Sequence, residues 1–259
     1  MKKFYNCFSA LGFTLLLSAN IQAQDSTDKK TPFPEGITVE YGIGGYAVTD
    51  EYISKEKYSG SLPYYSIGWS SRHSDYVYHL KLDYRNSDEI KNYNVSADIY
   101  QFTLNQGFSY ALPEFTIFDK EVYMFLGPAS ELFLYYNHQN IAVSGFDYSQ
   151  SIAVLISGGI STEIFYKLGD DLNLEGLLNF NVLSFGFRMV DEEETDESPV
   201  KILTLIAATN LVFDIGPRYY LFDNLSVKAS YLFHLTRISS WEHLLSASDN
   251  AVLTLTYGF

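Results

Sequence analysis

The 259-residue sequence contains a single cysteine, Cys7, which lies close to the N-terminus. The rest of the chain therefore cannot form disulfides, present a catalytic thiolate or bind a metal through cysteine. It also contains no Walker loop, dinucleotide fingerprint or histidine-based zinc motif. We therefore expect no cofactor and no metal centre.

Long apolar runs are also lacking. Beyond the N-terminus, none approaches the ~20 residues that a membrane-spanning helix needs. The one apolar stretch, residues 8–18, follows Lys2 and Lys3 and precedes Ile21-Gln22-Ala23. This order is typical of a signal peptide, and we predict residues 1–23 as the leader, cleaved after Ala23. Cys7 precedes the apolar stretch, whereas a lipid-anchored cysteine would follow it.

Basic residues are scarce, at 17 against 31 acidic residues. The predicted leader carries two of the basic and none of the acidic residues, which leaves 15 basic residues and a mature net charge of −16. Such an acidic chain is not expected to bind nucleic acid. The polar residues 24–36, with two prolines, are predicted to be a disordered periplasmic lead-in.

The sequence is rich in aromatic residues, at 17%, and its apolar and polar residues alternate with a period of two. In residues 76–85 one face reads Tyr, Tyr, Leu, Leu, Tyr and the other reads Val, His, Lys, Asp, Arg. A strand places successive side chains on opposite faces, so this segment is apolar on one side and ionic on the other. The same pattern predicts ten strands, at about 37–46, 62–71, 76–85, 97–110, 121–136, 151–167, 172–187, 201–221, 225–235 and 250–259.

The predicted connections alternate in length. Those at 72–75, 168–171 and 222–224 are tight and the one at 111–120 is longer, whereas those at 47–61, 86–96, 137–150, 188–200 and 236–249 are long and polar. With ten strands, the long connections all fall at one end. We therefore predict an all-β fold, a single antiparallel up-and-down transmembrane β-barrel over residues 37–259, with eight or twelve strands as alternatives.

A soluble sandwich or lipocalin-like barrel alternates too, with its apolar face inward. Here the polar face is rich in Gly, Ser, Thr and Asn, which suits a narrow lumen better than a solvated surface. Tyrosines also gather near strand ends on the apolar side, as in the aromatic girdles of membrane barrels. These are Tyr76, Tyr84, Tyr110, Tyr136, Tyr166, Tyr219 and Tyr257.

The C-terminal strand carries a more specific signal. Leu253, Leu255, Tyr257 and Phe259 alternate with small polar residues up to the last position. This strand resembles the terminal β-signal of Gram-negative outer-membrane proteins. The resemblance implies export to the outer membrane, insertion by the barrel-assembly machinery, and contact with outer-membrane lipids and lipopolysaccharide.

Strand parity also predicts which charged side chains face the lumen. There are six acids and five bases, a near balance that favours pairing across the lumen: Glu40, Lys81, Asp83, Arg85, Glu131, Glu163, Lys167, Glu175, Asp214, Arg218 and Lys228. A barrel of eight to ten strands is narrow enough for side chains to fill it. The alternative is a thin water-filled pore with these charges as its selectivity lining.

The predicted connection 188–200 contains the acidic run Asp191 to Glu197, with six carboxylates and no base. Hard oxygen ligands of this kind could hold divalent cations, although the spacing matches no EF-hand loop. The alternative is a solvated loop.

No catalytic residues are assigned from the sequence. Ten-stranded barrels include the omptin surface proteases, which use acidic pairs and an Asp-x-His element, but this chain contains no Asp-x-His. The nearest match, His73-Ser74-Asp75, falls in a predicted periplasmic turn. His79 and His234 are predicted to face inward at different depths, and His138 and His243 to lie in surface loops. The sequence thus favours a structural, adhesive or narrow-pore role, with a lipid- or peptide-hydrolysing surface enzyme as the alternative.

Overall fold

A computed structural model describes residues 35–72, 75–92, 96–140, 150–188 and 198–259. The predicted signal peptide, the lead-in up to residue 34, His73 and the acidic run Asp191 to Glu197 lie outside these residues. Among the described residues, no helix is long and apolar enough to cross a membrane.

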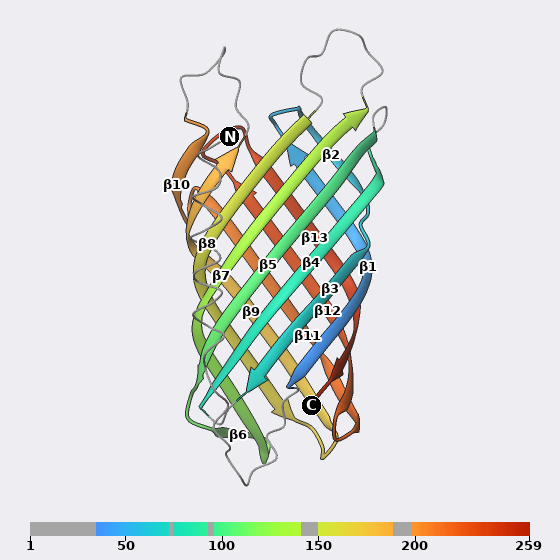
Figure 1. The fold of residues 1–259 in the computed structure, drawn as a ribbon, viewed down its shortest axis with the longest axis vertical. Coiled ribbons are helices and arrows are strands. Elements are labelled where there is room, and N and C mark those ends of the chain that lie inside the picture. The colour runs from blue at the N-terminus through green and yellow to red at the C-terminus, as the bar shows by residue number, and fades with distance from the viewer. Residues whose placement is uncertain (1–34, 73–74, 93–95, 141–149, 189–197) are drawn as a thin grey trace. The chain divides into compact units, whose positions relative to one another are not determined.

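The described residues form thirteen β-strands and no helix (Figure 1). They are β1 (Gly36–Asp50), β2 (Ser54–Ser61), β3 (Tyr64–Arg72), β4 (Tyr76–Lys91), β5 (Ser96–Ala111), β6 (Phe115–Ile117), β7 (Lys120–Asn140), β8 (Gln150–Lys167), β9 (Leu172–Arg188), β10 (Val200–Thr204), β11 (Ala208–Phe222), β12 (Leu225–Ile238) and β13 (Leu244–Tyr257).

These strands close into an antiparallel ring with ten positions, which confirms the predicted fold and strand number. β2 and β3 share one position beside β1, β10 and β11 share another beside β9, and β6 pairs only with β7 outside the ring. The first and last strands close the ring, with Ile37 opposite Tyr257. The start of β1 and the end of β13 thus lie at one end of the barrel, the lower end in Figure 1.

The upper end differs from the sequence prediction. The prediction of long loops at 47–61 and 236–249 is wrong, because the strands there continue into tight hairpins. β1 runs to Asp50 and β2 begins at Ser54, while β12 runs to Ile238 and β13 begins at Leu244. The predicted continuous strand 201–221 is interrupted at residues 205–207, where the Thr204 carbonyl accepts the Ala207 N–H at 2.9 Å.

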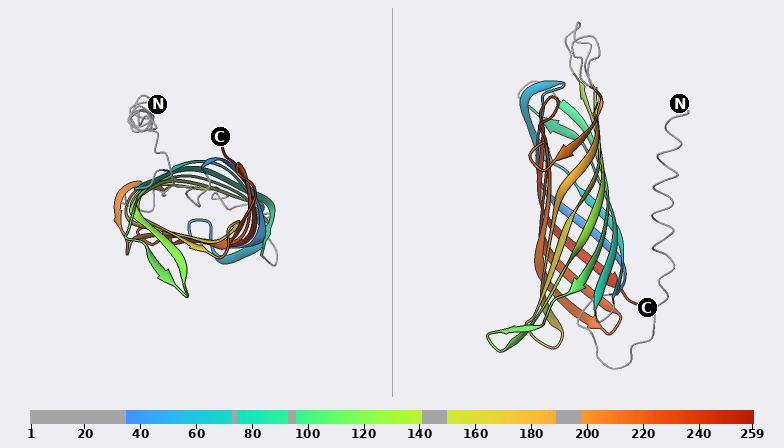
Figure 2. Two further views of the ribbon diagram at one scale, coloured as in Figure 1. Left: turned by 90° about the horizontal axis from the view of Figure 1, so that it is seen from below. Right: turned by 90° about the vertical axis from the view of Figure 1, so that its left-hand side faces the viewer.

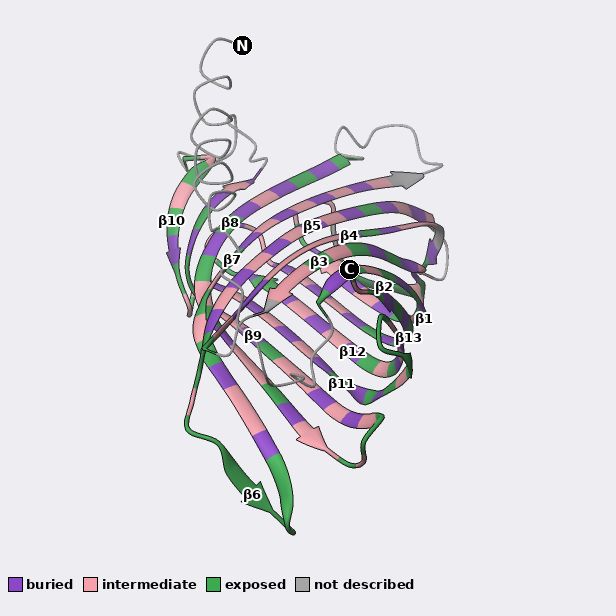
Figure 3. Cartoon of the chain, turned by 60° about the horizontal axis from the view of Figure 1, so that its bottom comes forward, coloured by how far each residue is buried: buried purple, intermediate pink, exposed green. Residues whose placement is uncertain are grey.

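The outward side of the barrel carries an apolar band. On β5, the outward side chains between Tyr100 and Tyr110 are mostly apolar, with Leu104 near the middle, while the inward ones are polar and buried. Leu253, Leu255 and Tyr257 on β13 belong to the same band and are about half exposed, at 58%, 48% and 54%. Figure 3 shows this alternation of buried and exposed residues along the strands.

Above the band the pattern inverts. Tyr100 contacts Tyr136 on β7, with ring centroids 6.0 Å apart. The next outward pair up is polar, Asp98 opposite His138, whereas the inward Ile99 beside it is fully buried. On β5 and β7 the wall above the band therefore has a polar outside and an apolar inside, as a soluble protein has. The inversion does not extend to β10, where Val200 and Ile202 are 40% and 74% exposed. Where the outside becomes polar, the sequence pattern predicts loops in place of the upper parts of the strands.

Candidate functional site

The upper lumen is filled by one apolar cluster, which we call the upper plug. Its buried side chains come from strands on every side of the ring, and Trp241 lies in the turn before β13. The members are Tyr46, Val48, Tyr58, Leu62, Ile90, Ala97, Ile99, Phe133, Tyr135, Ala153, Leu155, Leu203, Ala208, Ile238, Trp241 and Leu244. These aromatic and aliphatic side chains are only 0–7% exposed, so the cluster is almost inaccessible to solvent.

A buried ion pair accompanies the upper plug. Asp50 continues the inward row of Tyr46 and Val48, and its Oδ1 lies 2.5 Å from Nη2 of Arg188. Both side chains are 0% exposed, and Asn137 Nδ2 donates to the other Asp50 oxygen at 3.3 Å. The pair joins β1 to β9 across the barrel at its upper end.

Sequence reasoning missed both partners for identifiable reasons. Asp50 and Arg188 both fall in segments predicted as loops, 47–61 and 188–200. On β9 the register shifts, so that Asn181 and Leu183 have partners on β8 while Val182 between them has none. This β-bulge reverses the parity of the following residues and turns Arg188 inward. A run of two outward apolar residues, Val182 and Leu183, was the available signal.

Below the upper plug, a chain of hydrogen bonds links Arg85 to Glu131. Arg85 Nη1 lies 2.8 Å from His234 Nδ1, and since arginine only donates, Nδ1 must accept. His234 Nε2 then carries the proton and donates to Asn210 Oδ1 at 2.9 Å. Asn210 Nδ2 donates in turn to Glu131 Oε1. An arginine and a glutamate are thus connected through two neutral side chains.

A second cluster surrounds Tyr64, whose hydroxyl lies 2.7 Å from Glu40 Oε2 and 2.9 Å from Asp83 Oδ1. Lys81 Nζ lies 2.7 Å from the same Glu40 oxygen and 4.0 Å from Asp83 Oδ1, so it offsets one of the two carboxylate charges. Gly42 gives the tyrosine its room, because a Cβ there would lie 3.1 Å from the Tyr64 ring. Gly42 in β1 therefore has a packing reason.

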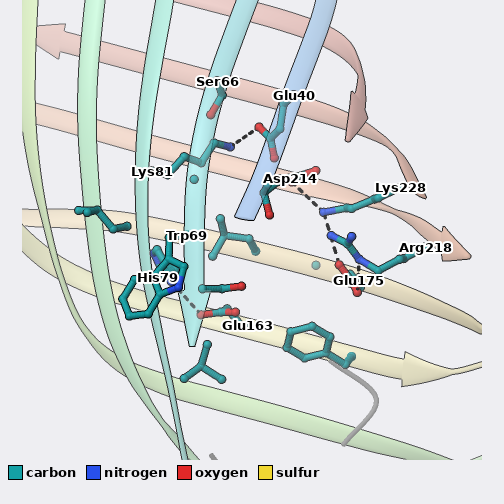
Figure 4. A pocket seen from close by; sticks show the side chains of 18 residues that line it. Glu40, Ser66, Trp69, His79, Lys81, Glu163, Glu175, Asp214, Arg218 and Lys228 are labelled. Atoms are coloured by element: carbon teal, nitrogen blue, oxygen red, sulfur yellow. Dashed lines mark hydrogen bonds and ion pairs between the residues drawn. The ribbon is translucent and has the colours of Figure 1, made fainter. Parts of the chain in front are cut away.

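The lower lumen contains three further pairs around a cavity of about 140 Å³ (Figure 4). Lys228 Nζ lies 2.8 Å from Asp214 Oδ2, and Arg218 Nε lies 2.7 Å from Glu175 Oε1. His79 Nδ1 lies 3.2 Å from Glu163 Oε1. Space and polar partners of this kind suit ordered water.

His79 depends on a glycine for its position. Its ring packs against Gly107 on β5, where a Cβ would lie 2.1 Å from the ring carbon Cε1. His79 and His234 contact different residues, in agreement with the different depths inferred from their strands.

The structure thus places ten of the eleven predicted lumen charges in these clusters. The eleventh, Lys167, lies at the lower rim and pairs with Glu121 at 3.7 Å, where both side chains are substantially exposed.

At the upper surface, the described residues show no catalytic arrangement. His138 lies on the outward side of β7 and its Nδ1 has no hydrogen-bond partner. His243 lies in the turn before β13, where its carbonyl accepts the Glu51 N–H at 2.9 Å. Within the described residues, no three His, Cys, Asp or Glu side chains are placed to hold a metal ion.

The closed ring, the apolar outward band and the polar lumen define the fold of an outer-membrane β-barrel. No protein-family model and no curated protein matches the chain.

Several solved structures match at low identity. The outer membrane protease OmpT from Escherichia coli is 10% identical, with 92% of this chain and 99% of that chain covered and a TM-score of 0.47. Neisserial surface protein A is 13% identical, with 87% and 99% covered and a TM-score of 0.36. The translocator domain of the autotransporter NalP from Neisseria meningitidis is 10% identical, with 100% and 98% covered and a TM-score of 0.39. Likenesses at this level carry no argument about what this chain does.

Proposed function

We propose that this chain is an integral protein of the Gram-negative outer membrane, with a barrel closed to ions and a structural or adhesive role at the cell surface. The observation that carries the proposal is the upper plug, which fills the lumen above the paired charges.

The outward band supports the membrane placement. On β5, the segment from Tyr100 to Tyr110 has the length of a membrane-spanning strand, about 9–11 residues. Aromatic side chains mark both of its ends, as at the two interfaces of a bilayer. The inversion above Tyr100 supports a position of this part of the wall in water. The two longest connections between strands, residues 141–149 and 189–199, both join strands at the upper end. Because the longer loops of such barrels are extracellular, we expect the upper end to face the cell exterior.

The lumen supports a closed barrel rather than a narrow pore. In a water-filled pore the lining charges are solvated. Here Arg218 and Glu175 are 5% exposed and bind each other, and the upper plug lies across the remaining route. With no passage for solutes, the surfaces left to act are the outer wall and the upper end. No described feature favours hydrolysis there.

Surface labelling of intact cells tests this placement. Lys57→Cys, on the exposed outward side of β2, should react with a membrane-impermeant maleimide. Asp170→Cys, in the lower turn between β8 and β9, is the matched control and should react only after the outer membrane is permeabilised. The protein should also remain with the membranes during carbonate extraction. Recovery from the soluble periplasm, or the opposite labelling pattern, would contradict the proposal.

The surface role can be tested with the same strains. If the role is adhesive, cells that produce the protein should attach to a test surface better than cells without it. If the role is structural, they should survive envelope stress better. Identical attachment and identical envelope integrity in the two strains would contradict both the adhesive and the structural role.

A further inference from the structure

The lower end of the barrel carries a hairpin that does not belong to its wall. β6 pairs with the first residues of β7, with Phe115 opposite Val122 and Ile117 opposite Lys120. Figure 2 shows this hairpin leaving the ring sideways at the lower end, away from the barrel axis. A segment that projects sideways from a membrane barrel lies over the ring of lipids around it.

The turn of the hairpin has an unusual residue at its tip. Phe118 and Asp119 both adopt left-handed backbone conformations, with φ of 51° and 62°. Turns of this geometry favour Asn-Gly, and a bulky residue there is strained. The Phe118 side chain is 90% exposed. An exposed aromatic ring held on a strained backbone suggests a role for the ring outside the protein's own packing.

The two faces of the hairpin differ in chemistry. Opposite residues in an antiparallel pair share a face. Val122 pairs with the outward Tyr166 of β8, so Phe115 and Ile117 continue the apolar outward side of the barrel. Thr116 and Glu121 occupy the other face, where Glu121 pairs with Lys167 at 3.7 Å.

A hydrogen bond attaches the apolar face to the barrel wall. The Tyr166 hydroxyl donates to the Ile117 carbonyl at 3.3 Å. The lipid-facing band is therefore continuous with the hairpin. Lys120 lies on the apolar face next to the tip, where its ammonium can reach lipid phosphates while its methylenes stay in apolar surroundings.

We propose that the β6–β7 hairpin is an interfacial anchor, with Phe115, Ile117 and Phe118 inserted at the boundary between headgroups and acyl chains of the periplasmic leaflet. This inference rests on the membrane placement proposed above and identifies its lipid contact at the lower end. Aromatic and aliphatic side chains beside a lysine suit that boundary, whereas Thr116 and Glu121 remain in water.

Site-directed spin labelling tests the anchor. Single cysteines are introduced at Ile117, Phe118 and Thr116 in the full chain carrying Cys7→Ser, and the protein is folded into phosphatidylethanolamine–phosphatidylglycerol vesicles. The ratio of collisions with oxygen to collisions with a water-soluble nickel chelate should be several-fold higher at Ile117 and Phe118 than at Thr116. Leu104→Cys in the apolar band is the lipid control, and Asp170→Cys in the neighbouring turn is the water control.

The outcomes separate the anchor from the membrane barrel. Equal, water-like ratios at Ile117 and Thr116, with a lipid-like ratio at Leu104, would overturn the anchor and leave the barrel in place. A water-like ratio at Leu104 would instead overturn the membrane placement itself. Protection of Ile117 and Phe118 from both reagents would show that a protein, such as a second copy of the chain, covers the hairpin, and would also overturn the lipid assignment.

Discussion

At the scale of single residues, the lumen is organised by charged side chains that are buried away from water. Asp50 and Arg188 are the extreme case, since both are fully buried. Removing water from two charges is unfavourable, so such a pair stabilises a fold only weakly compared with apolar packing. Its stronger effect is on specificity, because either residue alone would be an uncompensated buried charge.

This asymmetry gives a stability prediction. Asp50→Leu alone should lower the free energy of unfolding by about 3–5 kcal/mol, because Arg188 keeps its charge without a partner. The double variant Asp50→Leu with Arg188→Met should recover most of that loss. Urea unfolding of the protein in vesicles measures both.

The rim pair Lys167–Glu121 is the matched control, because it is solvent-exposed and its removal should change little. A double variant as unstable as Asp50→Leu alone would contradict the account of the buried pair.

At the scale of elements, strands are readable from sequence where lipid and lumen impose opposite chemistry on the two faces. This holds for the lower part of every strand, and the ten ring positions follow from it. It fails above the band on β5 and β7, where the inward Ile99 is apolar and the outward pair Asp98 and His138 is polar. Arg188 was not assigned because the bulge at Val182, opposite Gly158 and Gly159, reverses the parity of the residues that follow it.

The depth of the apolar band can be tested with one substitution at two positions on the same face of β5. Leu104→Arg should lower the free energy of unfolding by about 2–4 kcal/mol, since the arginine side chain would meet acyl chains near the midplane. Asp98→Arg lies beyond Tyr100 and should cost about 0–1 kcal/mol, the range for interfacial positions. Refolding titrations in vesicles compare them. Equal losses would show that the band ends elsewhere.

The C-terminal strand has a second expected role, as the sorting signal. Replacing Phe259 with Asp should sharply reduce the amount of barrel inserted in cells, while Phe259→Trp should retain most of it. The heat-modifiable electrophoretic mobility of membrane fractions measures insertion. In vitro refolding should be similar for the two variants, because Phe259 is 80% exposed and contributes little packing. Normal insertion of Phe259→Asp in cells would refute the signal.

At the scale of the whole molecule, the barrel has two stacked parts. The lower part has the apolar band outside and paired charges inside. The upper part has an apolar interior, and on β5 and β7 its outside is polar. Strand parity in the sequence predicts charge pairing in the lumen. It could not predict the upper plug, because the members of this cluster come from segments that lie far apart in the chain.

Single-channel recording in planar bilayers tests the closed lumen most directly. The wild-type protein should give no steady conductance, because the upper plug fills the lumen and the charges below it bind one another. Arg85→Leu or Glu131→Leu should destabilise the barrel by breaking the hydrogen-bonded chain through His234 and Asn210. A stable, cation-selective current from the wild-type protein, with both substitutions thermally neutral, would contradict the account and show that the protein is a small porin.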